Sequence, residues 1–208
     1  MNLSDYQIVD LSMYLRPGKE EQRLELRRGL IPADNTYYHD IDTMSHVGTH
    51  IEAPLHFYGE GPGAADLPLE TFLGEARLFD LSFLARDADV RAEALRAAGA
   101  DELRAGDIVV LTSRREAEDR VHLTPEAAQF LAEAQVKMVG FDDSIGLGRD
   151  EATSRAVHEP LMSRNIPFLE RLTNLEALPE PRFLLVALPW RVEGLDASPV
   201  RAVALVAK

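Results

Sequence analysis

Residues 46–56 have the sequence HVGTHIEAPLH, which carries His46, His50, Glu52 and His56. This stretch therefore places three imidazoles and a carboxylate within eleven positions, in a chain that has six histidines and no cysteine. Neutral imidazole nitrogens and carboxylate oxygens are ligands that suit zinc, manganese or ferrous iron. We therefore interpret the rest of the chain around a candidate metal site in this stretch.

The order of residue types in the stretch predicts a bend at Gly48. In an extended strand, His50 and Glu52 would share one face and lie about 6.5 Å apart, close enough to bind one ion. His46 and His50 would be about 13 Å apart, which is too far for a shared ion. Glycine permits a bulge or a turn between them. A helix would also bring residues four apart together, but the β-branched residues and Pro54 disfavour a long helix. We expect a bend at Gly48 and a change of chain direction at Pro54.

Composition excludes several classes of protein. The net charge is −13, from 22 basic and 35 acidic residues, whereas nucleic acids and anionic membranes are bound by basic surfaces. We interpret the acidity as a solvated surface. A length of 208 residues and a hydrophobic content of 46% suit one domain with a substantial core. A disulfide framework is excluded because cysteine is absent.

The start of the chain lacks the features of a targeting segment. Residues 1–10 contain acidic and polar side chains and no apolar run behind a basic lead, so we expect no signal peptide. No stretch approaches the apolar length of a transmembrane helix. The expectation is a cytoplasmic protein that acts on a small-molecule substrate.

Hydrophobic patterning predicts a mixture of strands and helices, which is typical of the α/β or α+β class. Strands are expected at residues 7–11, 36–45, 75–81, 107–112, 136–141, 182–188 and 200–207. Helices are expected at residues 90–98, 125–134 and 151–157, the second of them with Thr124 as N-cap and Pro125 at its first position. Residues 12–35 are expected to form an arm or loop region, in which the charged run 19–28 is either a solvated helix or part of the arm.

Four polar residues outside the stretch have open interpretations. His39 is expected at the surface, with a place behind the metal ligands as the alternative, and His122 is expected at the surface before a helix start. Asp142 and Asp143 follow an expected strand, where acids often reach an active-site crevice. A role in a turn or a helix cap is the equally good alternative for these two acids.

The pattern His-x-Gly-Thr-His-x-acid-x-Pro-x-His resembles the signature of the bacterial cyclase family, which includes kynurenine formamidase, isatin hydrolase and some lactone hydrolases. Residues 187–203, ALPWRVEGLDASPVRAV, also resemble the C-terminal segment of that family. The resemblance extends from Ile8 to the end of the chain. It implies an α/β fold of the cyclase (swivelling β/β/α-like) type, in which residues 1–208 form a single compact domain with a mixed sheet and flanking helices. It also implies a homodimer or a homotetramer.

The resemblance further implies a role for each candidate residue. It assigns one or two divalent ions per subunit, zinc or manganese, to the ligands His46, His50, Glu52, His158 and Glu170. It assigns acid/base catalysis, free of metal, to His56. From residue types alone, His158 would be a helix-end residue and Glu170 a solvated acid.

The chain departs from the formamidases at the acid of the signature and in the arm. Glu52 stands where the formamidases have Asp, so a single-metal site, as in the isatin hydrolases, is an alternative. Tyr14 stands in a region where kynurenine formamidase has a tryptophan, and in the family this arm helps to form the substrate pocket. The side chains expected to line the pocket here are Phe57, Tyr58 and Trp190, with the core as the alternative place for Phe57.

These residues predict a metal-dependent hydrolase that cleaves the amide bond of an aryl-formamide or a cyclic amide. A metal-bound hydroxide would attack the carbonyl carbon, and a metal-free imidazole would carry a proton to the leaving group. A lactone hydrolase or cyclase of the same family is one alternative. A metal-binding or small-molecule-binding homologue without turnover is the other.

Overall fold

The computed structural model describes residues 2–208. The strands are β1 (Tyr6–Asp10), β2 (Leu24–Ile31), β3 (Thr36–Thr43), β4 (His50–Glu52), β5 (Leu73–Asp80), β6 (Asp89–Val90), β7 (Ile108–Thr112), β8 (Val121–Leu123), β9 (Met138–Asp142), β10 (Ile145–Leu147), β11 (Phe168–Leu172), β12 (Arg182–Val186), β13 (Ala197–Pro199) and β14 (Val203–Ala207). The α-helices are α1 (Pro54–Tyr58), α2 (Ala92–Ala97), α3 (Pro125–Glu133) and α4 (Glu151–Met162). Short 3-10 helices occur at Leu3–Asp5, Leu69–Phe72, Ala100–Glu102, Ala117–Asp119 and Leu175–Ala177.

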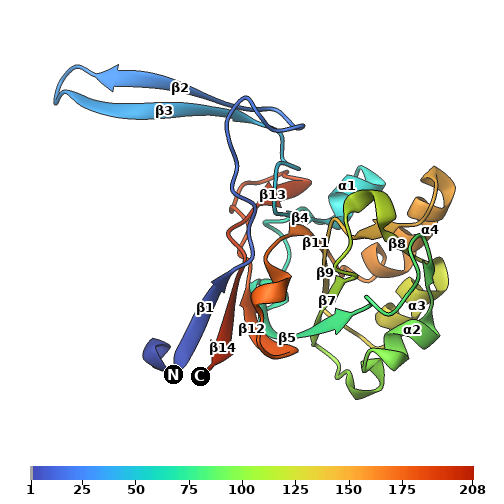
Figure 1. Cartoon of the computed structure of the whole chain (residues 1–208). Coiled ribbons are helices and arrows are strands. Elements are labelled where there is room, and N and C mark those ends of the chain that lie inside the picture. The colour runs from blue at the N-terminus through green and yellow to red at the C-terminus, as the bar shows by residue number, and fades with distance from the viewer. Residues whose placement is uncertain (1) are drawn as a thin grey trace.

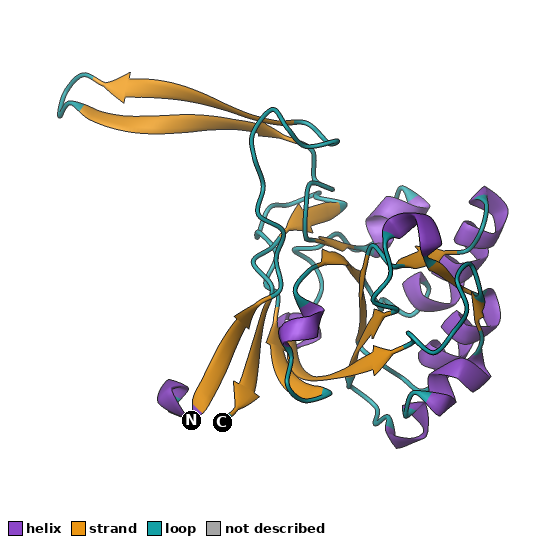
Figure 2. Ribbon diagram, viewed as in Figure 1, coloured by secondary structure: helices purple, strands orange, loops and turns teal. Residues whose placement is uncertain are grey.

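Nine of these strands form one curled sheet in the order β1-β14-β12-β5-β7-β9-β11-β4-β13 (Figure 1). The central strands β5, β7, β9 and β11 are parallel to one another, whereas the strands on both flanks pair antiparallel. Helices α2, α3 and α4 lie together against one face of the parallel region (Figure 2). The expected α/β fold with a mixed sheet and flanking helices is confirmed.

Strand β7 shows why the parallel centre is buried on both faces. Ile108 and Val110 belong to the core inside the curl of the sheet, together with Phe72. Val109 and Leu111 belong to the core beneath the helices. Side chains alternate between the two faces of a strand, so a continuous apolar run supplies both cores.

A hairpin of β2 and β3 projects away from the sheet (Figure 1). Its antiparallel register runs from Leu24 opposite Thr43 to Ile31 opposite Thr36. The charged run 19–28 is therefore not a helix, because its second half is part of β2. His39 lies in β3 with an exposed side chain, as expected for a surface residue.

The remaining differences from the expected elements concern bounds and short strands. Helix α4 continues past the expected end at residue 157 to Met162, so it carries His158 and includes Pro160. Strands β4 and β13 contain only three residues each, which is too short for an alternating pattern to identify. Within residues 2–208, no helix has the length and apolar character needed to cross a membrane.

Candidate metal centre

A turn at residues 45–49 brings His46 back onto His50. Gly48 has a φ of 61°, a conformation that glycine adopts without steric cost, and a Cβ at this position would lie 2.6 Å from Leu15 Cδ2. As a result, His46 Nδ1 lies 3.1 Å from His50 Nε2. The expected bend at Gly48 is confirmed, and α1 begins at Pro54.

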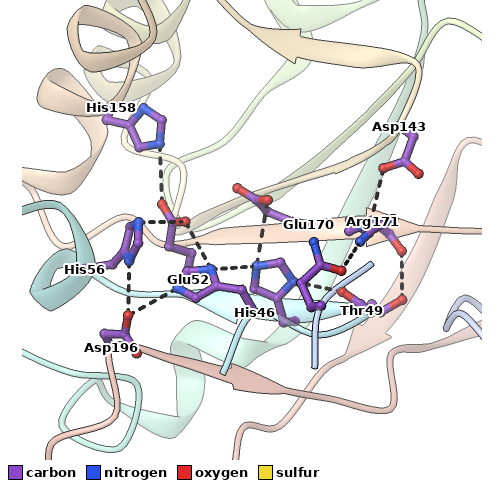
Figure 3. A network of polar contacts seen from close by, with 12 residues as sticks. His46, Thr49, Glu52, His56, Asp143, His158, Glu170, Arg171 and Asp196 are labelled. Atoms are coloured by element: carbon purple, nitrogen blue, oxygen red, sulfur yellow. Dashed lines mark hydrogen bonds and ion pairs between the residues drawn. The ribbon is translucent and has the colours of Figure 1, made fainter. Parts of the chain in front are cut away.

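The register of the sheet places Glu170 beside this pair. Strand β11 runs antiparallel to β4 with Glu170 directly opposite His50, and residues that face each other across two strands point to the same side. His50 Nε2 lies 3.7 Å from Glu170 Oε2. Helix α4 adds His158, whose Nε2 lies 3.3 Å from Glu52 Oε1. The five residues that the resemblance assigns to metal therefore converge (Figure 3).

Backbone carbonyls fix which nitrogen two of the histidines turn toward the centre. His50 Nδ1 donates to Gly48 O at 2.8 Å, and His158 Nδ1 donates to Ser154 O at 2.7 Å. A carbonyl oxygen only accepts hydrogen bonds, so each Nδ1 carries a hydrogen, and in the neutral ring each Nε2 then presents a lone pair. Histidines that bind metal ions in proteins are commonly held in this way, by a hydrogen bond from the ring nitrogen that does not bind the metal.

The carboxylate of Glu52 lacks the donors that such a buried group requires. Glu52 is 5% exposed, and within residues 2–208 its Oε1 has no hydrogen-bond partner. Its Oε2 lies 3.6 Å from His46 Nδ1. Two ligand atoms that each lie about 2.1 Å from a shared ion are about 3.0 to 3.4 Å apart. The residues present therefore fit a divalent cation, which would satisfy the buried oxygen and the converging lone pairs.

The ionisation of these groups also favours a cation. Burial lowers the pKa of His50 to about 4, so this imidazole stays neutral and able to bind metal near pH 7. Burial, followed by the charge of Glu52, raises the pKa of Glu170 to about 8. Burial opposes ionisation of Glu52, but the neighbouring imidazoles, His158 first, lower its pKa below the usual value. Two nearby carboxylates can both be ionised when a positive ion lies between them.

His56 and Asp196 lie next to each other at one end of this cluster, and both side chains are partly exposed (Figure 3). His56 lies in α1 with 42% of its side chain exposed, and its Nε2 is 3.7 Å from Glu52 Oε2. Its Nδ1 is 3.0 Å from Asp196 Oδ2, an oxygen that also lies 3.1 Å from His46 Nε2. Sequence reasoning missed Asp196 as a site residue. The available signal was its place in GLDASP, directly before the strand that pairs with Glu52.

Of the three aromatic residues expected to line a substrate pocket, Phe57 and Tyr58 lie side by side, with ring centroids 4.8 Å apart, whereas Trp190 lies elsewhere. Phe57 stacks on His158, with ring centroids 5.4 Å apart and planes 6° from parallel. Tyr58 donates a hydrogen bond from its hydroxyl to Glu159. Trp190 lines a different cavity of about 350 Å³ between residues 64–72 and 189–191. Phe57 thus packs against His158, one of the candidate metal ligands.

A polar cavity of about 490 Å³ opens directly beside Glu170. Asp143 and Arg171 line it, and Arg171 donates a hydrogen bond to Gln22 at 2.9 Å. Asp142 also lines the cavity, but Thr112 and Ser144 donate hydrogen bonds to its carboxylate, which gives it a role in the turn. Asp143 therefore lines a cavity, as the first interpretation expected, and Asp142 stabilises a turn, as the second expected.

His122 lies away from the centre. It belongs to β8, in a small parallel sheet with β6 and β10. Its Nε2 lies 3.1 Å from Asp87 Oδ1, and its Nδ1 lies 2.9 Å from Gly148 O. These contacts give His122 a structural role on the central strand of the small sheet, where its side chain is 16% exposed.

Fold and site together define an α/β protein with a centre of histidines and carboxylates, and the comparisons place it in a family. The sequence family described as Putative cyclase matches residues 9–144. The kynurenine formamidase of Salinibacter ruber is 35% identical over 165 residues, which cover 76% of this chain and 75% of that protein. The chain therefore belongs to the cyclase family.

Two solved structures have a similar fold. One is described as a potential metal-dependent hydrolase with cyclase activity; it is 26% identical, has a TM-score of 0.79, and the match covers 98% of this chain and 99% of that one. The other is an isatin hydrolase bound to the product analogue thioisatinate, at 22% identity and a TM-score of 0.82, with 99% and 94% coverage. The expected membership of the cyclase family is confirmed.

Substituting Gly48 by alanine should weaken the centre. A left-handed backbone costs a non-glycine residue roughly 1 to 2 kcal/mol, and the new Cβ must also displace Leu15. We expect a lower free energy of unfolding in urea and weaker binding of zinc, because His46 and His50 move apart. Gly106→Ala is the matched control, since Gly106 also has a positive φ but has open space around it. Equal zinc affinity in the two variants would contradict this account.

The stability of the metal-free protein should fall between pH 6.5 and pH 8. Burial holds a proton on Glu170 until about pH 8, whereas the ordinary value is 4.5. The folded state therefore binds more protons than the unfolded state in this range, so stability is lost as the pH rises. Unfolding in urea with a chelator present measures the effect. Glu170→Gln should make the free energy of unfolding depend less on pH. A wild-type protein that is equally stable at pH 6.5 and pH 8 would show that the pKa of Glu170 is not raised.

Proposed function

We propose that this chain is a metal-dependent hydrolase that cleaves the amide bond of an aryl-formamide or a cyclic amide. The observation that carries the proposal is the convergence of His46 Nδ1, His50 Nε2 and Glu52 Oε2, together with the second oxygen of Glu52, the buried Oε1, which lacks a hydrogen-bond partner among the described residues. Relatives named kynurenine formamidase and a fold shared with an isatin hydrolase support the choice of bond.

The proposed metal ligands form two groups that share Glu52. Its Oε2 faces His46, and its Oε1 faces His158. This division supports one or two ions per subunit, and histidine with carboxylate ligands suits zinc or manganese. The chemistry that such an ion supplies is acidification of water and polarisation of a carbonyl oxygen.

His56 is the proposed acid/base. Its Nδ1 is bound to Asp196, so its Nε2 faces the centre and is free to take or give a proton. Its partial exposure gives a substrate access to this nitrogen. The polar cavity lined by Glu170 is the proposed entry for the substrate, because Glu170 belongs to the cluster.

The first test is a substrate panel on protein of known metal content. We expect zinc- or manganese-loaded enzyme to hydrolyse N-formylkynurenine or isatin, and we expect a chelator to abolish turnover. A lactone in the same panel tests the alternative of C–O cleavage, which would be favoured if its turnover exceeded that of every amide. Loaded protein that hydrolyses no member of the panel would refute the proposed function.

Removing the proposed base should separate catalysis from metal binding. His56→Ala should lower kcat by about 100-fold or more, which is the usual contribution of a positioned acid/base. Its zinc content should equal that of the wild type, measured by elemental analysis. A variant that loses zinc would show that His56 is a ligand, and a variant with full activity would exclude it as the base.

We also propose that the chain forms a homodimer or a homotetramer through the β2–β3 hairpin. An isolated two-stranded hairpin is marginally stable in water, and large exposed apolar side chains mark interaction surfaces. The side chains of this kind on the hairpin are Leu26, Leu30, Ile31, Tyr37, Tyr38 and Ile41. The cytoplasmic location expected from the sequence stays a prediction.

Shortening the hairpin should disrupt the assembly. Replacing residues 24–43 by a short glycine-serine linker removes the exposed apolar side chains and leaves the nine-stranded sheet intact. Light scattering should give a multiple of 23.1 kDa for the wild type and about the mass of one chain for the variant. A monomeric wild type, or a variant that assembles equally well, would contradict the proposal.

A further inference from the structure

One carboxylate, that of Asp196, contacts both the proposed base and a proposed metal ligand. Its Oδ2 lies 3.0 Å from His56 Nδ1 and 3.1 Å from His46 Nε2. Its Oδ1 accepts a hydrogen bond from the hydroxyl of Ser45 at 2.9 Å. The two imidazole rings are themselves close, with centroids 4.3 Å apart. Both oxygens of the carboxylate are therefore engaged, and one of them serves two rings.

The backbone holds Asp196 firmly in this position. Its carbonyl oxygen accepts a hydrogen bond from Ala53 N at 3.0 Å, and the next residue, Ala197, pairs with Glu52 in the sheet. Asp196 is therefore fixed relative to β4 and to the start of α1. A carboxylate held in this way can fix the orientation of the imidazole rings that donate hydrogen bonds to it.

His56 needs such an anchor. It lies in a helix of five residues, its side chain is 42% exposed, and the other group that its ring nitrogens approach is Glu52, at 3.7 Å. A carboxylate accepts hydrogen bonds, so Asp196 selects the tautomer of His56 with a hydrogen on Nδ1. The lone pair of Nε2 then faces the centre, where a base must act.

The same oxygen selects the tautomer of His46. A hydrogen on Nε2 of His46 is donated to Asp196, which leaves the Nδ1 lone pair to face His50 Nε2 and Glu52 Oε2. We propose that Asp196 is a positioning residue that orients the base His56 and the ligand His46 together. This inference rests on the proposed function of the centre.

A metal ion held by His46, His56 and Asp196 is the competing interpretation of the same three groups. Their potential ligand atoms lie within 4.8 Å of one another. However, His46 would have to bind one ion through Nδ1 and a second through Nε2, which requires loss of both ring protons. Hydrogen bonding needs no such ionisation and explains the short distances to Oδ2.

The direct test is the tautomer of His56 in the wild-type chain, measured by ¹⁵N NMR on metal-free protein. We expect Nδ1 to carry the hydrogen, and Asp196→Asn to change the tautomer balance because the amide can turn its NH₂ toward the rings. A wild-type protein with the hydrogen on Nε2 would overturn the inference. So would a variant with the unchanged tautomer.

Metal binding and kinetics give independent readouts on the holoenzyme. In Asp196→Asn, zinc affinity should fall by about 10- to 100-fold, as for other groups that orient metal ligands, while the number of ions at saturation is unchanged. With an amide substrate, kcat should fall and KM should change little, and Asp196→Glu should recover part of kcat. Loss of one whole ion per chain would make Asp196 a ligand and overturn the inference.

A carboxylate outside the centre supplies the matched control. Asp66 accepts a hydrogen bond from the backbone N–H of Gly63, so Asp66→Asn makes the same chemical change away from the two rings. It should alter neither zinc affinity nor the tautomer of His56. If the wild type hydrolyses no amide, the proposed function fails, whereas the NMR and zinc measurements still decide the role of Asp196.

Discussion

The antiparallel pairing of β4 with β11 is the contact on which the centre depends. It places Glu170 directly opposite His50, and it fixes Glu52 on the same face of the strand. Ile51 and Leu169, which alternate with these residues, pack into the core inside the sheet. A shift of one residue in this register would turn the polar side chains into this apolar core and the apolar ones toward the centre, so core packing and the geometry of the centre enforce each other.

Electrostatics explains why this arrangement calls for a cation. Burial keeps His50 neutral and raises the pKa of Glu170, and the buried oxygen of Glu52 lacks a hydrogen-bond donor among the described residues. Each feature is unfavourable in a protein without a bound ion, and a divalent cation offsets all of them at once. The metal-free protein is therefore less stable than the metal-bound protein.

Parts of this arrangement could be predicted from the sequence, because they depend on local rules. Gly48 had to bend the chain if His46 and His50 were to meet, and the apolar run at residues 107–112 indicated a strand. Glu170 and Asp196 could not be placed in this way. Their positions depend on the pairing of strands far apart in the chain, β4 with β11 and β4 with β13, and two of these strands are only three residues long. The resemblance to a family supplied Glu170, whereas Asp196 emerged from the structure alone.

The central claim is that one divalent ion lies between His46, His50 and Glu52. Anomalous X-ray diffraction at the zinc edge, on crystals of protein loaded with zinc, tests this most directly. The account predicts a strong anomalous peak within bonding distance of His46 Nδ1, His50 Nε2 and a carboxylate oxygen of Glu52. Saturating zinc with no peak between these atoms, or with His46 hydrogen-bonded to His50 in its place, would contradict the account.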